Sequence, residues 1–453
     1  MTSRDLSTII KAYDVRGVVP DQLDADIARA LGAAFALFVG APRIVVARDM
    51  RESGVELGAA FAEGVTSQGV DVVDAGLGST DLLYFASGRL DLPGAMFTAS
   101  HNPAKYNGIK LCLAGAKPVG QDTGLAQLRT DAERFLAEGL PSYGGTPGTR
   151  TEQPMLADYA AYMKELVPGL EGMRPLTVVV DAGNGMGGLT VPVTFQGLPL
   201  TTTELYFALD GNFPNHEANP IEPANLVDLQ AAVLEHKADL GLAFDGDADR
   251  CFVVDERGQI VSPSTLTALI AVRELAREPG STIIHNLITS KAVPEIVAEH
   301  GGTPVLTRVG HSFIKAEMAR TGAIFGGEHS GHFYFREFWN ADSGMLAALH
   351  TMAALGGSSG TLSDLLSTYT PYVASGEVNS TVEDQAGRIA AIKKAYASLE
   401  QDELDGLTVT SPQGWWFNVR ASNTEPLLRL NVEAPDETAM ARVRDEVLAL
   451  IRA

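Results

Sequence analysis

The residues best suited to chemistry lie in two short segments far apart in the chain. Thr98-Ala99-Ser100-His101-Asn102-Pro103 offers a hydroxyl in a polar turn, and Asp245-Gly246-Asp247-Ala248-Asp249-Arg250 offers three carboxylates at every second position. Hard cations such as Mg²⁺ take oxygen ligands and commonly act together with phosphate. A hydroxyl combined with such a metal site predicts phosphoryl transfer, in which catalysis is mainly positioning and charge neutralisation.

The three aspartates allow other interpretations. Asp245, Asp247 and Asp249 have the spacing of a calcium loop, and Glu256 stands at its twelfth position. However, the sixth position, which needs glycine, is Arg250, and the residues before the loop predict a strand where an EF-hand has a helix. A solvated acidic turn is the remaining alternative, although three carboxylates this close repel one another unless a cation joins them.

Two further signals have simple structural readings. Ser100 alone could be an ordinary turn residue, and we expect His101, its immediate neighbour, not to point back at it; a Gly-x-Ser-x-Gly elbow is absent. The segment Gly183 to Gly188 follows a predicted strand and matches the dinucleotide pattern, with Glu204 near the position of a ribose carboxylate. Because Asp181 places a negative charge where a pyrophosphate would bind, we interpret this segment as a tight turn.

Two other loops offer groups that suit a phosphorylated sugar. Gly326 to His332 carries a carboxylate, a hydroxyl and two imidazoles between glycines, which suits a loop that binds sugar hydroxyls. Arg420 to Pro426 offers guanidinium, hydroxyl and amide donors after a predicted strand, which suits a phosphate that is not transferred. Each loop could also be an ordinary surface turn.

Composition places the chain among ordinary globular proteins and excludes several classes of partner. Its 453 residues predict about three or four domains. A formal charge of −22 argues against binding to nucleic acid or anionic membranes, but a small phosphorylated substrate fits if basic residues gather locally. Cys112 and Cys251 fall in apolar strands and are expected to be buried thiols. Neither a signal-like apolar run near the N-terminus nor an 18-residue apolar span is found, so we expect a cytoplasmic protein.

The pattern strand, helix, strand occurs three times and predicts three related α/β layers. The predicted strand, helix and strand are 44–47, 53–67 and 71–73 in the first unit, 177–180, 185–196 and 200–205 in the second, and 282–284, 290–300 and 304–306 in the third. From about residue 371 the pattern changes to strands at 408–410, 415–419 and 427–432 and a final helix with Asp436 as its N-cap. The expected domains are 1–150, 151–256, 257–371 and 372–453.

Read from Tyr13-Asp14-Val15-Arg16-Gly17 through the Ser100, Asp245 and Glu328 loops to the Arg420 loop, the chain resembles the α-D-phosphohexomutase family, most closely its bacterial phosphomannomutase/phosphoglucomutase type. The resemblance implies three tandem α/β domains with mixed sheets between helices, plus a smaller C-terminal α+β domain, around a central cleft. It also implies an intramolecular phosphotransferase of the isomerase class. Such an enzyme interconverts hexose 1-phosphate and 6-phosphate through a phosphoserine and a hexose 1,6-bisphosphate, which also serves as activator.

The resemblance further implies roles for individual residues. Ser100 would carry the phosphate, and Asp245, Asp247 and Asp249, with the phosphoserine oxygen, would bind Mg²⁺. Proton transfer would fall to Arg16, Lys110 and His332. The substrate-binding residues would be Tyr13, Arg250 and His311 in the active site, Glu328 and Ser330 on the sugar O3 and O4 hydroxyls, and Arg420, Ser422, Asn423 and Thr424 as the phosphate clamp.

Some positions depart from the family pattern. Ile288 falls near the position at which many relatives carry a lysine that contacts the sugar, and Lys291 lies one helical turn away from it. Asp81 stands where a Thr-Pro pair is common. His329 replaces the Met or Gln of neighbouring subfamilies, and the absence of Gln favours mannose and glucose phosphates. A phosphoglucosamine mutase is the alternative within the family, and a Mg²⁺-dependent sugar phosphatase the alternative outside it. We expect sugar phosphates as partners, no nucleic acid or membrane, and a monomer or weak dimer.

Overall fold

The computed structural model describes residues 4–10, 13–422 and 426–453. The chain forms two compact units. The first comprises Met1–Val261 and Ser330–Ser363, and the second comprises Ser262–His329 and Asp364–Ala453. No helix in the described part of the chain is long and apolar enough to cross a membrane.

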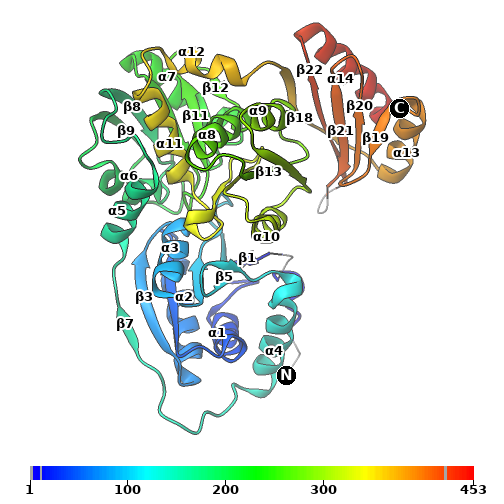
Figure 1. The fold of residues 1–453 in the computed structure, drawn as a ribbon. Coiled ribbons are helices and arrows are strands. Elements are labelled where there is room, and N and C mark those ends of the chain that lie inside the picture. Colours follow the sequence, from blue (N-terminus) through cyan, green and yellow to red (C-terminus); the bar gives the residue numbers. More distant parts are fainter. Residues whose placement is uncertain (1–3, 11–12, 423–425) are drawn as a thin grey trace. The chain divides into compact units, whose positions relative to one another are not determined.

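The N-terminal part of the first unit is a mixed sheet with helices on both faces (Figure 1). Its elements are β1 (Val15–Val18), α1 (Ala25–Val39), β2 (Arg43–Arg48), α2 (Ser53–Ser67), β3 (Asp71–Leu77), α3 (Thr80–Leu90), β4 (Gly94–Phe97), β5 (Tyr106–Leu113), β6 (Lys117–Pro118), α4 (Leu125–Glu138) and β7 (Arg150–Glu152). The strand order is β1-β5-β4-β2-β3-β7, and β6 pairs with β5. Helix α1 packs against α2 and α4, whereas α3 packs against β2, β4 and β5. The Ser100 loop connects the antiparallel strands β4 and β5.

The rest of the first unit is built on a second mixed sheet of order β12-β11-β10-β8-β9. Its elements are α5 (Leu156–Leu166), β8 (Leu176–Asp181), α6 (Gly187–Phe195), β9 (Leu200–Leu205), α7 (Val227–His236), β10 (Leu240–Phe244), β11 (Cys251–Asp255), β12 (Ile260–Val261), the antiparallel pair β16 (Phe333–Phe335) and β17 (Ala341–Asp342), and α11 (Gly344–Gly356). Strands β8, β9 and β10 are parallel, and β11 returns antiparallel to β10. The tight connection between β10 and β11 carries Asp245 to Arg250.

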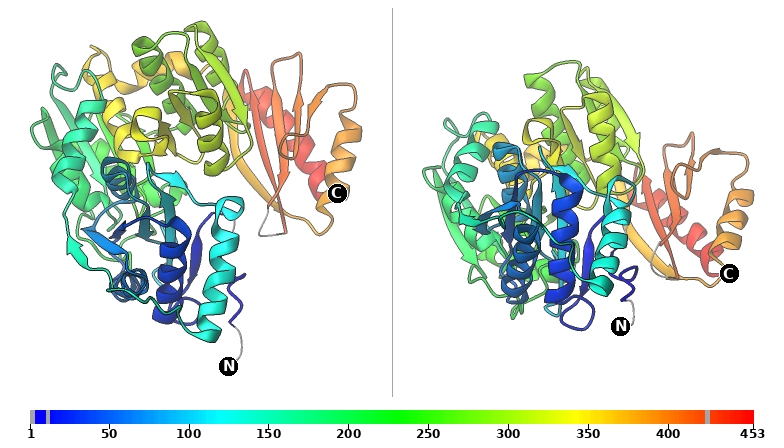
Figure 2. Two further views of the ribbon diagram at one scale, coloured as in Figure 1. Left: turned by 60° about the horizontal axis from the view of Figure 1, so that its bottom comes forward. Right: turned by 90° about the horizontal axis from the view of Figure 1, so that it is seen from below.

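The second unit contains a parallel layer and an antiparallel layer. Its elements are α8 (Pro263–Arg277), β13 (Thr282–Asn286), α9 (Ala292–Glu299), β14 (Thr303–Thr307), α10 (His311–Thr321), β15 (Phe325–Gly327), β18 (Val373–Thr381), α13 (Gln385–Ala395), β19 (Glu400–Asp402), β20 (Leu407–Thr410), β21 (Trp416–Ala421), β22 (Leu427–Ala434) and α14 (Glu437–Arg452), while the division between the units falls within α12 (Leu362–Leu366). Strands β14 and β15 flank β13 in parallel. The final sheet has the antiparallel order β18-β22-β21-β20-β19, and α13 and α14 pack on it (Figure 2).

The predicted fold class is confirmed: mixed sheets lie between helices, and a smaller antiparallel α+β domain ends the chain. The predicted helix 53–67 has the same first and last residues as α2. Helices α6 and α9 each begin two residues later than predicted, because the residues before them form the connecting loops. Asp436 caps α14 by accepting a hydrogen bond from Ala439 N at 2.8 Å. Both cysteines are buried thiols, as expected.

Candidate active site

Ser100 lies directly against the aspartate loop. Its Oγ donates a hydrogen bond of 2.9 Å to Asp245 Oδ2, and the serine is 5% exposed. Its backbone adopts a left-handed conformation with φ +49°, which is rare for a residue with a side chain. The aspartate loop approaches closely because residue 246 is glycine: a Cβ there would lie 2.4 Å from Ser100 O. The hydroxyl and the three carboxylates therefore belong to one site.

The three aspartates form a buried all-oxygen cluster. Asp245, Asp247 and Asp249 are at most 1% exposed, and one carboxylate oxygen from each lies within 4.8 Å of the others. Lys110 Nζ contacts Asp247 at 2.8 Å and Asp249 at 2.6 Å, and Arg250 Nε contacts Asp245 at 2.9 Å. When all three carboxylates are ionised they outnumber the two cationic side chains that face them, which leaves negative charge for a further cation.

The ionisation of the cluster reflects this crowding. Burial raises the pKa of Asp245 well above its ordinary value, and the charges of Asp249 and Asp247 add to the effect while Arg250 opposes it. Burial also disfavours the charged form of Asp247, but Lys110 outweighs it and lowers the pKa of that carboxyl. For Lys110, burial is likewise outweighed by Asp247 and Asp249, which raise its pKa well above the ordinary value. A divalent cation would relieve the repulsion that disfavours ionised Asp245.

The donor set fits Mg²⁺. Among the described residues, Asp247 Oδ1 and Asp249 Oδ1 are buried without a hydrogen-bond partner, an arrangement that metal ligation would satisfy. A second group, formed by Asp249, His332 and Asp342, also has its potential ligand atoms within 4.8 Å. That group mixes nitrogen and oxygen, so it is less suited to a hard cation than the three aspartates. Strand β10 precedes the aspartate loop and β11 follows it, which agrees with the rejection of an EF-hand.

The expectation that His101 points away from Ser100 is wrong. His101 Nδ1 lies 3.0 Å from Ser100 Oγ and 2.6 Å from Nη2 of Arg250. Because a guanidinium only donates, Nδ1 is an acceptor and the neutral ring carries its proton on Nε2. Burial, with the charges of Arg250 and Arg16, lowers the pKa of His101 to about 2. The left-handed turn at Ser100 brings the next side chain back, which sequence adjacency alone does not predict.

The first unit also brings other expected residues to this site. Arg16 donates to Asn102 Oδ1 at 2.7 Å, which connects β1 to the Ser100 loop. His332 Nε2 lies 3.8 Å from Asp249 Oδ1, and its Nδ1 lies 2.9 Å from Ser330 Oγ. Tyr13 is 36% exposed. Arg16, Lys110, Arg250, Ser330 and His332 are thus gathered around Ser100 or the aspartates.

Two residues missed in the sequence support this arrangement. Thr80, at the start of α3, donates to Asp247 Oδ2 at 2.6 Å. Arg51, 1% exposed, donates from its guanidinium to backbone carbonyls of the Ser100 loop. Neither belongs to a recognisable motif, because the role of each depends on contacts with a loop distant in the chain.

Asp81 now has a structural explanation. This fully buried carboxylate accepts hydrogen bonds from the hydroxyls of Ser79, Tyr159 at 2.8 Å and Ser343 at 2.6 Å. Ser79 is the N-cap of α3 and Ser343 is the N-cap of α11, so the negative charge lies near two helix N-termini. Burial raises the pKa of Asp81 to about 7, although the three hydroxyls oppose the shift.

The remaining expected residues belong to the second unit. Glu328 is buried and accepts from Asn286 Nδ2 and Gly310 N, each at 3.2 Å. Arg420 Nη2 contacts Glu377 Oε2 at 2.9 Å, and the backbone N of Ser422 donates to Leu427 O. His311 begins α10. Asn423 and Thr424 lie outside the described residues.

The Gly183 segment is a tight turn that supports the aspartate loop. Asp181 accepts from Gly183 N at 2.8 Å, and Met186 N donates to Gly246 O at 2.9 Å. A Cβ at residue 185 would lie 2.7 Å from Gly246 O, so the two loops pack backbone to backbone. The structure therefore gives the glycines a packing role.

Family models cover nearly the whole chain. The α/β/α domains I, II and III of phosphoglucomutase/phosphomannomutase match residues 7–134, 157–258 and 262–372, and the C-terminal domain of the same family matches residues 377–450. The fold and the acidic site together define a phosphohexomutase, a mutase of the isomerase type.

Individual relatives agree with the family models. "Phosphohexose mutases" of Xanthomonas campestris pv. campestris are 40% identical over 98% of both chains. A phosphomannomutase of Escherichia coli is 38% identical over 98% of this chain and 99% of its own. The crystal structure of a phosphoglucomutase/phosphomannomutase family protein from Burkholderia thailandensis matches with a TM-score of 0.88 and 35% identity, covering 98% of this chain and 97% of its own. The chain belongs to the phosphoglucomutase/phosphomannomutase family of α-D-phosphohexomutases.

Proposed function

We propose that this protein interconverts the 1-phosphate and 6-phosphate of mannose, with glucose phosphates as second substrates, through a phosphate carried on Ser100. The observation that carries the proposal is the 2.9 Å contact between Ser100 Oγ and Asp245 Oδ2 within the three-aspartate cluster. Phosphomannomutase and phosphohexose mutase are the names of relatives that match almost end to end.

The reaction has two transfers in opposite directions. The free O1 or O6 hydroxyl of a hexose monophosphate attacks the phosphorus on Ser100 and loses its proton to a basic side chain. The bond from phosphorus to Oγ breaks, and Oγ takes up a proton. The product of this half-reaction is a hexose 1,6-bisphosphate. After it turns around, Ser100 Oγ loses its proton and attacks the other phosphate. The bond from that phosphorus to the sugar oxygen breaks, and the sugar oxygen takes up a proton. The sugar phosphate formed is the isomer of the one that entered.

We assign the supporting roles as follows. Asp245, Asp247 and Asp249 would hold Mg²⁺, which supplies charge neutralisation for the transferring phosphoryl group. Arg16, Lys110 and His332 are proposed for proton transfer, and the proximity of all three to the Ser100 loop or the aspartates supports this. The substrate contacts are assigned to Tyr13, Arg250, His311, Glu328, Ser330, Arg420, Ser422, Asn423 and Thr424, in domains spanning 1–150, 151–256, 257–371 and 372–453.

The alternatives differ in a measurable product. A phosphoglucosamine mutase would prefer glucosamine 1-phosphate, and a sugar phosphatase would release inorganic phosphate because water would reach the phosphoserine. The decisive experiment compares kcat/KM for mannose, glucose and glucosamine 1-phosphates while inorganic phosphate is measured, with the mass of Ser100 peptides determined in parallel. We expect the highest kcat/KM for mannose 1-phosphate. We also expect a phosphate on Ser100 and little release of inorganic phosphate. Stoichiometric phosphate release, or an unmodified Ser100 in active protein, would contradict the proposal.

A further inference from the structure

We propose that Arg51, covered by Phe213, is a positioning residue that holds the Ser100 loop in its reactive conformation. This inference rests on the proposed transfer through Ser100, although its claim about loop order can be measured separately. The hydrogen bonds of the Arg51 guanidinium go to backbone carbonyls of the Ser100 loop. Arg51 would act through the backbone of the loop.

The guanidinium of Arg51 binds four carbonyls within seven residues of the loop. Nη2 donates to Ser100 O at 2.9 Å and Asn102 O at 2.6 Å, and Nη1 donates to Pro103 O at 3.1 Å and Tyr106 O at 2.9 Å. Asp49 orients Arg51 from the other side, accepting from its backbone N at 2.9 Å and lying 3.4 Å from its Nε. Hydrogen bonds with a charged partner are roughly twice as strong as neutral ones. One side chain therefore fixes the path of the whole loop.

This path matters because Ser100 has a backbone conformation that its sequence does not favour. Its φ of +49° places it in the left-handed region, which L-residues with a Cβ rarely adopt. Two hydrogen bonds restrain its backbone: Thr98 Oγ1 accepts from Ser100 N at 2.8 Å, and Arg51 binds Ser100 O. Loss of Arg51 would leave four carbonyls without this donor and permit Ser100 to relax toward ordinary dihedrals. The direction of Oγ toward Asp245 would change with it.

Phe213, in the segment between β9 and α7, covers the guanidinium of Arg51. The guanidinium carbon lies 5.1 Å from the centre of the Phe213 ring, a cation–π contact. The chain can approach here because residue 211 is glycine: a Cβ would lie 3.0 Å from Arg51 Cα. The same phenylalanine is near the aspartate loop, since a Cβ at residue 246 would lie 3.6 Å from its ring. Phe213 thus contacts Arg51, which holds the Ser100 loop, and also lies beside Gly246 of the aspartate loop.

The competing explanation is that Arg51 only stabilises the fold. A stabilising residue would change the free energy of unfolding without changing turnover of the folded protein. A positioning residue would lower kcat much more than it raises KM, because it does not contact the sugar phosphate. It would also lower the phosphate occupancy of Ser100 and loosen the loop specifically. These readouts separate the two roles.

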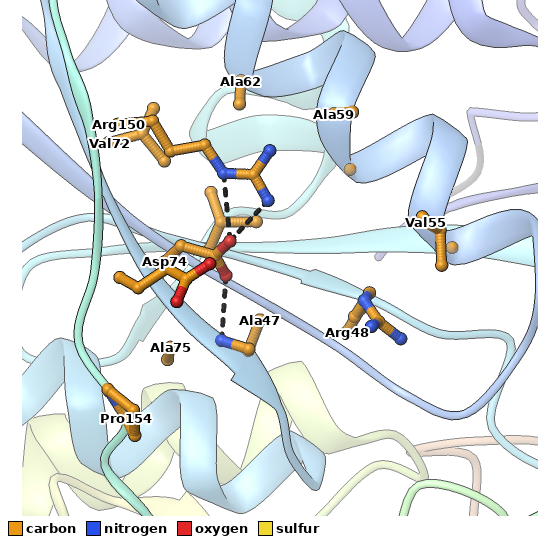
Figure 3. A pocket seen from close by; sticks show the side chains of 15 residues that line it. Ala47, Arg48, Val55, Ala59, Ala62, Val72, Asp74, Ala75, Arg150 and Pro154 are labelled. Carbon is orange, nitrogen blue, oxygen red and sulfur yellow. Dashed lines mark hydrogen bonds and ion pairs between the residues drawn. The ribbon is translucent and has the colours of Figure 1, made fainter.

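The test uses two variants and one matched control. Arg51→Ala removes the guanidinium, and added guanidinium ion at a low, non-denaturing concentration can occupy the space, with equal urea as the reagent control. Phe213→Leu keeps an apolar side chain of similar size but removes the aromatic face, and Phe213 is only half-buried, so this variant should fold. Arg150→Met is the control. Arg150 is a half-exposed arginine that pairs with Asp74 and lines a separate pocket of about 340 Å³ beside α2 (Figure 3).

We expect kcat for Arg51→Ala to fall about 100-fold, as for a small displacement of a reacting group, with KM changed much less. Guanidinium, but not urea, should restore part of kcat. Phe213→Leu should lower kcat roughly threefold to thirtyfold, as expected for the loss of one cation–π contact. Hydrogen–deuterium exchange of residues 98–106 should accelerate in both variants. Arg150→Met should match the wild type in kcat and in the exchange of residues 98–106.

Two outcomes would overturn the inference, and a third would overturn the proposed function instead. Unchanged kcat, phosphate occupancy and exchange in Phe213→Leu would overturn the inference even if Arg51→Ala fails to fold. A folded Arg51→Ala variant with wild-type kcat would do the same. If the wild type itself has no mutase activity and no phosphate on Ser100, the proposed function fails instead, while the exchange measurements still test whether Arg51 orders the loop.

Discussion

Thr80 holds Asp247 by two hydrogen bonds that join helix α3 to the aspartate loop. The threonine hydroxyl donates to Asp247 Oδ2 at 2.6 Å, and its backbone N donates to Asp247 O at 3.0 Å. Because Lys110 contacts the same Oδ2 at 2.8 Å, the other oxygen, Oδ1, is left available for a cation. Partners of this kind orient metal ligands and commonly change metal affinity when they are removed.

Replacing Thr80 by valine should therefore weaken activation by Mg²⁺. Thr80→Val keeps the shape of the side chain but removes the donor, so the Mg²⁺ concentration for half-maximal activity should rise about tenfold to 100-fold. Chelator should abolish activity in both wild type and variant, and excess Mg²⁺ should restore both. Thr130→Val, in which an exposed hydroxyl on α4 is removed, provides the control. Equal Mg²⁺ requirements in all three proteins, or full wild-type activity in chelator, would count against the metal assignment.

Removing the nucleophile should abolish turnover without unfolding the protein. Ser100→Ala deletes only an Oγ atom from a loop, so the melting temperature should change little while kcat falls by about 1,000-fold or more. The check is kcat by a coupled assay, thermal unfolding, and intact mass. The variant should also lack the phosphate expected on the wild type. Turnover close to that of the wild type would remove the covalent transfer from the mechanism.

Asp81 should make stability depend on pH in a predictable direction. Its pKa is about 7 in the folded protein and about 3.8 when unfolded, so the folded state holds a proton that the unfolded state has lost between these values. The stabilisation from this proton is complete below the unfolded pKa and is lost as pH rises through about 7. Urea unfolding across this range should show the wild type losing roughly 2 to 4 kcal/mol more than Asp81→Asn. Parallel pH profiles for the two proteins would show that Asp81 does not titrate in this way.

Glu377 should compete with phosphate for the arginines of the last domain. Its carboxylate contacts Arg420 at 2.9 Å and Arg429 at 3.1 Å, so a phosphate binding to Arg420 must displace or share it. Glu377→Gln removes the competing charge, and the KM for the sugar phosphate should fall about threefold to tenfold. The exposed Glu400 of β19 offers a control, Glu400→Gln, with unchanged KM. A higher KM in Glu377→Gln would instead mean that Glu377 aligns the arginines for phosphate.

Local patterns accounted for most of the fold because they report short-range physics. Alternation of apolar residues and turn formers located the strand–helix–strand units, and the Asp436 cap fixed the start of α14. The expectation for His101 failed because it depended on one backbone angle, at Ser100, that is set by contacts from distant residues. Asp81 was equally opaque, since its hydroxyl partners Tyr159 and Ser343 come from other parts of the chain.

The sequence by itself determined the chemistry available to this protein: a hydroxyl, three closely spaced carboxylates and the basic side chains that balance them. Only the tertiary structure decided that Ser100 meets Asp245, that Lys110 and Thr80 converge on Asp247, and that Arg51 binds the loop carbonyls. The physical reason is separation along the chain. Residue type and spacing set which groups can react or bind, whereas contacts between residues 49 to 167 positions apart depend on how the sheets and helices pack.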